Sequence, residues 1–334
     1  MELKIIAVML GLLQIITSIH NNNNIHCCGS GGVVMGSQIP AMFVFGDSLL
    51  DDGDLIGLPP LPPFAATATG ITSILNGVNY ASAAAGILDD TGKNLGDRYT
   101  LRQQVQNFKT SVTQLKAQMD DNKLSEYLGK SLALINIGSN DYLNNYLMPS
   151  LYSTSFTYNP RDYAHLLIAS YTDQILVLHS LGVKKFFLTA VGPLGCIPNQ
   201  LATGLAPPGN CISFVNDWVE IFNMQLKSLV DQLNHNHSDS IFVYGNTYAA
   251  FNDVLDNPSS YGFEVTDRGC CGIGRNEGLI TCLPFAIPCF NRDKYVFWDA
   301  YHPTQAFNRI MAQRAYSGPP SDCYPINIKQ MALI

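Results

Sequence analysis

Short apolar runs alternate with stretches of helical periodicity along most of the chain. The pattern predicts five buried strands, and near-continuous apolar strands are typical of a parallel sheet covered on both faces. Four of these strands end directly before a glycine. The predicted strands cover residues 42–45, 78–81, 132–137, 185–191 and 241–244.

Between the strands, apolar positions recur at the spacing of amphipathic helices. Asn159 can cap a helix that has Pro160 at its first position and that Gly182 closes. Further helices are predicted over residues 101–119, 212–233 and 304–316. Because strands and helices alternate, we expect an α/β fold with a parallel sheet, and we find no internal repeat.

The N-terminus has the pattern of a targeting segment. Lys4 precedes a mostly apolar run over residues 5–19, and four asparagines then interrupt it. The run is shorter than the roughly 20 apolar residues of a membrane-spanning helix. We therefore predict a signal peptide within residues 1–26, a secreted protein without a stable membrane span, and one folded domain over 40–320. A buried core helix is the alternative interpretation.

Composition narrows the possible partners. The chain has 334 residues, of which 47% are hydrophobic and 13% charged, and its net charge is −7. No basic run is longer than the pair Lys184 and Lys185, so nucleic acid is not expected as a partner. We expect a monomer.

Nine cysteines and a secretory signal favour disulfides. A zinc site is the alternative, but the adjacent Cys270 and Cys271 have poor ligand spacing. Seven of the cysteines lie beyond the N-terminal region, an odd number, so one thiol either stays free or pairs outside this set. Cys196 and Cys211 flank a short Gly/Pro loop and are the preferred pair. The disulfide candidates are Cys196, Cys211, Cys271 and Cys282.

If the protein is secreted, Asn236 can be glycosylated. It begins the only N-glycosylation sequon, Asn236-His237-Ser238, and is predicted to be modified at the surface.

Three short blocks could supply a nucleophile and donors for an oxyanion. Ser48 lies two residues after Gly46, at the end of the first strand, where its hydroxyl can stand above the sheet edge. Gly86 ends a run of small residues that lets a carbonyl approach the backbone, and Asn140 lies in a turn after the third strand. Taken singly, each block also fits a structural role: a helix cap, close packing and an ordinary turn.

The fourth block is FWDAYHPT, at residues 297–304. Asp299 and His302 are three residues apart on one loop, so the carboxylate can fix the tautomer of the imidazole. The other ring nitrogen can then take a proton from a serine hydroxyl. The alternative is a solvated loop histidine. With Ser48, the chain order Ser, Asp, His predicts a catalytic triad.

The four blocks together resemble the plant GDSL esterase/lipase family within the SGNH hydrolases. The resemblance runs from Pro40 to about Tyr316 and includes the stretches AVGPLGCIP at 190–198 and CCGIGRNEGLITCLPFAIPC at 270–289. It implies a flavodoxin-like three-layer α/β/α sandwich with a mostly parallel five-stranded sheet. It implies carboxylic ester hydrolysis without metal or organic cofactor. By resemblance Ser48, Asp299 and His302 are the triad, and Ser48, Gly86 and Asn140 form the oxyanion hole.

One segment departs from the family pattern. Residues 54–76 are shorter than expected and include four prolines at 59, 60, 62 and 63, which exclude a regular helix there. The segment therefore lacks a covering helix, and part of one sheet face is expected to be exposed unless another segment covers it. The function predicted is a secreted serine esterase or lipase that acts on a small-molecule or lipid ester. An acyltransferase using the same site and an inactive extracellular pseudoenzyme are the alternatives.

Overall fold

The structure is a computed structural model that describes residues 39–49, 60–67 and 74–334. The predicted signal peptide at 1–26 and part of the shortened segment 54–76 lie outside the described residues. Within this part of the chain, no helix is both long and apolar enough to cross a membrane.

The central sheet contains all five predicted strands, in parallel, and one more. Its order is β10-β5-β4-β3-β1-β2, so the parallel strands have the order 2-1-3-4-5 of flavodoxin-like folds. The sixth strand pairs antiparallel with β5 at one edge. The strands are β1 (Met42–Gly46), β2 (Gly77–Asn79), β3 (Leu132–Asn136), β4 (Lys185–Thr189), β5 (Ile241–Gly245) and β10 (Cys323–Tyr324).

The register of the sheet brings the carboxyl ends of its strands level. Gly46 of β1 lies opposite Asn136 of β3, and Thr189 of β4 lies opposite Gly245 of β5. Residues that follow these strands therefore meet along one edge of the sheet, where open parallel sheets bind their ligands.

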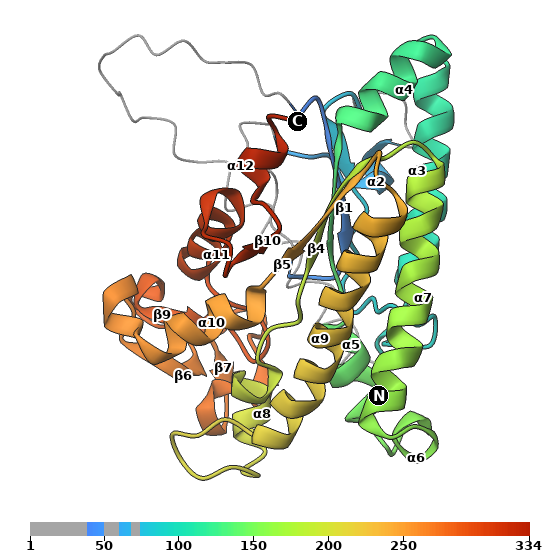
Figure 1. Cartoon of the computed structure of the whole chain (residues 1–334). Coiled ribbons are helices and arrows are strands. Elements are labelled where there is room, and N and C mark those ends of the chain that lie inside the picture. The colour runs from blue at the N-terminus through green and yellow to red at the C-terminus, as the bar shows by residue number, and fades with distance from the viewer. Residues whose placement is uncertain (1–38, 50–59, 68–73) are drawn as a thin grey trace, which may run out of the picture.

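Helices cover both faces of this sheet, which gives the expected three layers (Figure 1). Four predicted helices are present with small shifts at their ends. Thr100 forms a capping box with Gln103 at the start of α3, and Asn159 caps α7 with Pro160 at its first position. The helices of one face are α3 (Leu101–Lys116), α4 (Asp121–Lys130), α7 (Pro160–Ser180) and α9 (Ser213–Asn236), and those of the other are α11 (Gln305–Ser317) and α12 (Ile328–Met331).

Shorter elements complete the described chain. The strand β6 pairs in parallel with β9, and β7 pairs antiparallel with β8, so two small sheets lie beside the main one. Their bounds are β6 (Val265–Gly269), β7 (Gly272–Ile273), β8 (Ile280–Thr281) and β9 (Tyr295–Phe297), and the short helices are α2 (Phe64–Thr67), α5 (Ser139–Asp141), α6 (Thr154–Thr157), α8 (Pro198–Ala202) and α10 (Thr247–Asp256).

Alternate side chains of β1 enter two different cores. Phe43 and Phe45 face α3, where the ring of Phe108 meets both at centroid distances of 4.9 and 5.7 Å. Met42 and Val44 face the opposite way and belong to a second buried cluster. All five residues of β1 are buried, as a central parallel strand requires.

The expected exposed sheet face is covered under β1 and its neighbours by the end of the chain. Ile328 and Met331 of α12 are buried in the same cluster as Met42, Val44 and Phe187. On the other side, Pro63 of the shortened segment bridges Asn79 of β2, and Phe64 packs on Tyr80. Contacts from α12 and from residues 63 and 64 therefore cover the sheet beside β1 and β2. Within residues 54–76, the short helix α2 begins directly after Pro63, so the prolines do not exclude a single helical turn there.

We expect Met331→Ala to lower the free energy of unfolding by about 2–5 kcal/mol, because it removes a fully buried side chain from the cluster under β1. Leu333→Ala is the matched control, since Leu333 is 72% exposed and its loss should cost no more than about 0.5 kcal/mol. Denaturant unfolding of the two variants measures the difference. Equal, small losses would mean that α12 does not cover the sheet.

Candidate active site

Ser48 lies on a tight turn directly after β1. The backbone N–H of Leu49 donates to Asp47 Oδ1 at 3.0 Å, which makes an Asx turn around the serine. Just before the turn, the buried side chain of Gln104 accepts from the N–H of Gly46 and donates to its carbonyl, both at 2.8 Å. A side chain from α3 therefore holds the backbone that presents the Ser48 hydroxyl.

Asp299 and His302 lie on the loop after β9. The N–H of Trp298 donates to the carbonyl of His302 at 2.8 Å, which folds the loop back on itself. The N–H groups of Tyr301 and His302 donate to Asp299 Oδ1 at 2.9 and 2.8 Å. Thr304 ends the loop by capping α11. The spacing of three residues thus places the carboxylate and the imidazole side by side on one short loop.

The three predicted triad residues form a continuous chain of hydrogen bonds. Ser48 Oγ lies 2.8 Å from His302 Nε2 although the two residues are 254 positions apart. His302 Nδ1 lies 2.9 and 3.0 Å from the two oxygens of Asp299. The side chain of Asp299 is 9% exposed and that of His302 is 36% exposed, so the carboxylate is enclosed and the ring is open to a substrate. This is the geometry of a Ser–His–Asp triad.

The pKa values of the pair agree with an ionised carboxylate beside the imidazole. Burial alone would raise the pKa of Asp299, but hydrogen bonds from His302 and the loop outweigh it and the pKa lies below its ordinary value. Burial alone would lower the pKa of His302, yet its hydrogen bond to Asp299 and the charges of Asp299 and Asp47 raise it above 6.5. The imidazolium form is therefore stabilised, as a general base requires after it has taken a proton.

Asn140 connects the serine block with the glycine block. Its amide nitrogen donates to Asp47 Oδ2 at 3.3 Å and to the carbonyl of Ala85 at 2.9 Å. Asn144 donates to the amide oxygen of Asn140 at 2.6 Å, which fixes the orientation of the amide. Of the residues that the structure describes, none accepts a hydrogen bond from the N–H of Ser48 or Gly86. The three candidate oxyanion donors are the N–H groups of Ser48 and Gly86 and the amide of Asn140. They therefore lie on segments that hydrogen bonds of Asn140 connect.

The buried carboxylate of Asp141, which binds the backbone next to Gly86, was not predicted from the sequence. Asp141 accepts from the N–H groups of Ile87 and Leu88 at 2.8 and 3.1 Å and from the hydroxyl of Thr91 at 2.7 Å. A Cβ on Gly86 would lie 2.7 Å from Asp141 Oδ1, so only glycine fits beside this carboxylate. Burial raises the pKa of Asp141 to about 6. Its place next to Asn140 was the only signal for it in the sequence.

The cysteines form three disulfides in the described chain. The pair Cys196–Cys211 is confirmed, the candidates Cys271 and Cys282 pair with each other, and Cys270–Cys289 is a third bridge that was not predicted. Cys323 is the free thiol among the described cysteines. The odd number of cysteines had predicted one thiol that is free or pairs outside this set of seven.

Two of these disulfides, Cys270–Cys289 and Cys271–Cys282, lie against the loop that carries Asp299 and His302. The N–H groups of Cys270 and Cys271 donate to the carbonyls of Phe297 and Trp298 at 3.0 and 2.8 Å. Next to Cys282, the hydroxyl of Thr281 donates to Asp299 Oδ2 at 2.8 Å. Thr281 is thus a fourth group that binds the carboxylate, and nothing in its own sequence context had indicated it.

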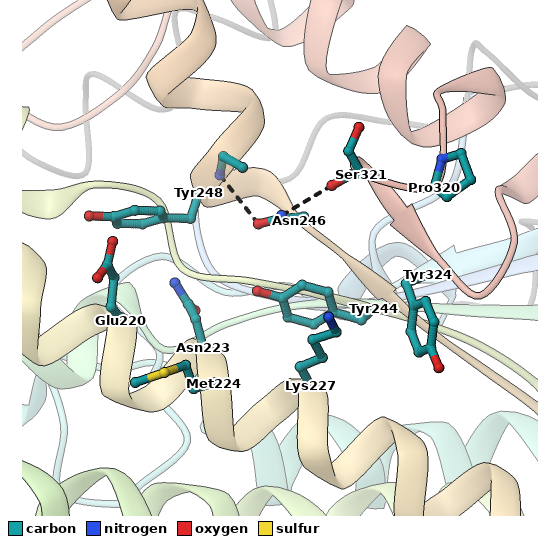
Figure 2. A pocket seen from close by; sticks show the side chains of 11 residues that line it. Glu220, Asn223, Met224, Lys227, Tyr244, Asn246, Tyr248, Pro320, Ser321 and Tyr324 are labelled. Atoms are coloured by element: carbon teal, nitrogen blue, oxygen red, sulfur yellow. Dashed lines mark hydrogen bonds between the residues drawn. The ribbon is translucent and has the colours of Figure 1, made fainter.

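One pocket lies away from the triad residues, between α9 and residues 320–324. Its volume is about 370 Å³, and Tyr244, Tyr248 and Tyr324 line it with Glu220 and Lys227 (Figure 2). No histidine is among its lining residues, so it holds no base for a serine. Across residues 39–49, 60–67 and 74–334, no three His, Cys, Asp or Glu side chains gather as metal ligands would.

Serine, imidazole and carboxylate joined by hydrogen bonds at the edge of a flavodoxin-like sheet are the arrangement typical of serine hydrolases on an α/β sandwich. Comparison with known proteins gives the family. Residues 42–315 match the family model of the GDSL-like lipase/acylhydrolases, so the chain belongs to this family of carboxylic ester hydrolases. The matched range lies within the predicted domain of residues 40–320.

Curated relatives agree with this membership. The chain is 49% identical to the Arabidopsis thaliana GDSL esterase/lipase At1g71250, over 89% of this chain and 90% of the relative. It is 48% identical to GDSL esterase/lipase At5g08460 of the same plant, over 89% and 88%. The first alignment extends over 337 residues although it uses only 89% of this 334-residue chain. This relative therefore has residues without a counterpart here, in agreement with the predicted missing segment.

We expect Thr281→Val to lower kcat/KM for ester hydrolysis by about 10–100-fold, because the buried Asp299 carboxylate loses one hydrogen bond while the shape of the side chain is kept. Thr281→Ser, which keeps the hydroxyl, should restore most of the activity. Steady-state kinetics with a p-nitrophenyl ester measures both variants. Wild-type turnover by the valine variant would show that Thr281 does not support the triad.

Proposed function

We propose that the protein is a secreted serine esterase or lipase that hydrolyses carboxylic esters through an acyl-enzyme on Ser48. The observation that carries this proposal is the hydrogen-bonded chain from Ser48 Oγ through His302 to Asp299. A pseudoenzyme would need none of these three side chains within hydrogen-bonding distance of one another. Family membership supports ester hydrolysis by an independent route.

The first half-reaction transfers the acyl group to the enzyme. His302 Nε2 takes the proton of Ser48 as the serine Oγ attacks the ester carbonyl and forms a tetrahedral intermediate. When the intermediate collapses, the bond to the alcohol oxygen breaks, and the imidazolium gives its proton to the leaving alcohol. Asp299 keeps its charge throughout and stabilises the imidazolium.

The second half-reaction releases the acid. Water gives a proton to His302 Nε2 and attacks the acyl-enzyme, and the second tetrahedral intermediate expels Ser48 Oγ, which recovers its proton. An alcohol or sugar in place of water would make the same site an acyltransferase. The names of the family and of its relatives as lipases and esterases favour water.

The oxyanion of both intermediates would be stabilised by the N–H groups of Ser48 and Gly86 and by the amide of Asn140. The two N–H groups have no partner in the described part of the chain, so they can donate to a substrate oxygen without breaking an existing bond. The 3.3 Å bond from Asn140 to Asp47 is the longer of its two, and we assign it as the one that the oxyanion replaces.

Secretion is supported by the three disulfides, which persist in oxidising compartments, and by the targeting pattern of residues 1–26. Asn236 is exposed at the last residue of α9, where an oligosaccharide transferase can reach the sequon. We propose a secreted, glycosylated monomer. Expression in plant cells, followed by analysis of the extracellular fluid and of the mass change on enzymatic deglycosylation, tests secretion and glycosylation. Size-exclusion chromatography of the secreted protein tests whether it is a monomer.

We expect Ser48→Ala to lower kcat for p-nitrophenyl ester hydrolysis by about a million-fold, because the nucleophile is lost. The same variant should fail to react with a fluorophosphonate, which labels only activated serines. Ser125→Ala, at an exposed position of α4, is the control and should keep both properties. Unchanged turnover or labelling of the Ser48→Ala variant would refute the assignment of the nucleophile.

We expect kcat/KM to rise with pH through a midpoint above 6.5, because only neutral His302 can accept the serine proton and its pKa is raised. Asp47 contributes to this rise through its charge, although burial raises the pKa of Asp47 itself to about 7. Asp47→Asn should therefore move the midpoint to lower pH. A wild-type midpoint at or below 6.5, or a shift to higher pH in the variant, would contradict the electrostatics described above.

A further inference from the structure

A cavity of about 210 Å³ lies under the edge of the sheet, next to residues that adjoin Ser48 and His302 in the sequence. At one end it is lined by Leu49, which follows the nucleophile, and by Tyr301 and Pro303, which flank the base. From there it lies between the carboxyl ends of β3 and β4 and the helices α10 and α11. The cavity is thus lined by sequence neighbours of Ser48 and His302, although these two residues do not line it themselves.

The walls of this cavity are largely apolar and belong to the buried core. Phe187, Phe251, Phe297 and Phe307 line it and are each at most 6% exposed. Protein interiors normally leave few voids larger than a water molecule, because unfilled space lowers stability. An apolar space of this size, lined by the residue that follows Ser48, is suited to an apolar part of the substrate.

The length of the cavity follows α11. Phe307, Met311 and Ala315 are four residues apart on one face of this helix and all line the cavity. At 1.5 Å per residue they span about 12 Å. At the far end, Arg314 pairs with Asp322 through two bonds of 2.9 and 2.8 Å, and both residues also line the cavity. This charged pair gives an alkyl chain no apolar surface to continue along.

We propose that this cavity, which we call the α11 cavity, binds a medium-length alkyl chain of the ester while its carbonyl lies at Ser48. The proposal rests on the proposed esterase function. Its small residues Ala312 and Ala315 leave the space that the chain occupies, and the Arg314–Asp322 pair sets the upper limit of its length. The α11 cavity therefore selects esters by chain length, between short esters that leave it empty and long ones that exceed it.

The test compares kcat/KM across two series of esters with the glycosylated, disulfide-bonded enzyme. In the first series, p-nitrophenyl acetate, octanoate and palmitate vary the acyl chain, and in the second, ethyl, octyl and hexadecyl acetate vary the alcohol. Each methylene that enters the cavity should raise kcat/KM by about fourfold until the cavity is full. A gain from two to eight carbons and a loss at sixteen, in one series, is expected and identifies which side of the ester occupies the cavity.

Ala312→Leu narrows the cavity, and Gln313→Leu adds the same side chain one residue away at an exposed position of α11. We expect Ala312→Leu to lower kcat/KM for the preferred eight-carbon ester by about 10–100-fold while acetate turnover changes less than about twofold. Gln313→Leu should change neither. If Ala312→Leu does not fold, as judged by a lost thermal unfolding transition, Ala315→Leu at the far end of the cavity replaces it.

Two failures of this test are distinguishable. A serine that does not react with a fluorophosphonate and hydrolyses no ester overturns the proposed function itself. A labelled enzyme that hydrolyses acetate esters but gains nothing from chain length in either series overturns only the α11 cavity as an alkyl site. Equal losses on short and eight-carbon esters in both cavity variants would also overturn it, because a general loss of activity is not a change in specificity.

Discussion

The structure of the site depends on one buried carboxylate. Asp299 is almost fully enclosed, and an unpaired charge in such surroundings would be strongly destabilising. Four donors prevent this: the N–H groups of Tyr301 and His302, the hydroxyl of Thr281 and the ring of His302. Because the carboxylate is held from several directions, it can hold the imidazole in one orientation, and Nε2 is left to face Ser48.

The residues around this carboxylate come from three segments that only the fold brings together. The loop 299–302 follows β9, whereas Thr281 belongs to a small hairpin that the disulfide Cys271–Cys282 closes. Ser48 follows β1 in the main sheet, more than two hundred residues earlier. The parallel sheet provides a common edge for the serine and Asn140, and the small disulfide-bonded sheets place the base over that edge.

The face of the sheet beside α11 has two different surroundings. Under β1 it is packed by α12, so residues near the end of the chain cover this part of the sheet. Beside β3 and β4 the apolar α11 cavity remains next to the triad. All five residues of β1 are nevertheless buried, because alternate residues of that strand pack into separate cores.

The sequence by itself determined the five parallel strands, four main helices, the pair Cys196–Cys211 and the expectation that Ser48, Asp299 and His302 meet, because these follow from local periodicity, capping residues and compact motifs. It did not reveal the antiparallel β10, the cover by α12, the roles of Gln104, Asp141 and Thr281 around the site, or the α11 cavity. Each of these depends on contacts between residues far apart in the chain, and no local pattern records which distant side chain will satisfy a buried donor or fill a space. Only the tertiary structure could decide them, since it alone sets those distances.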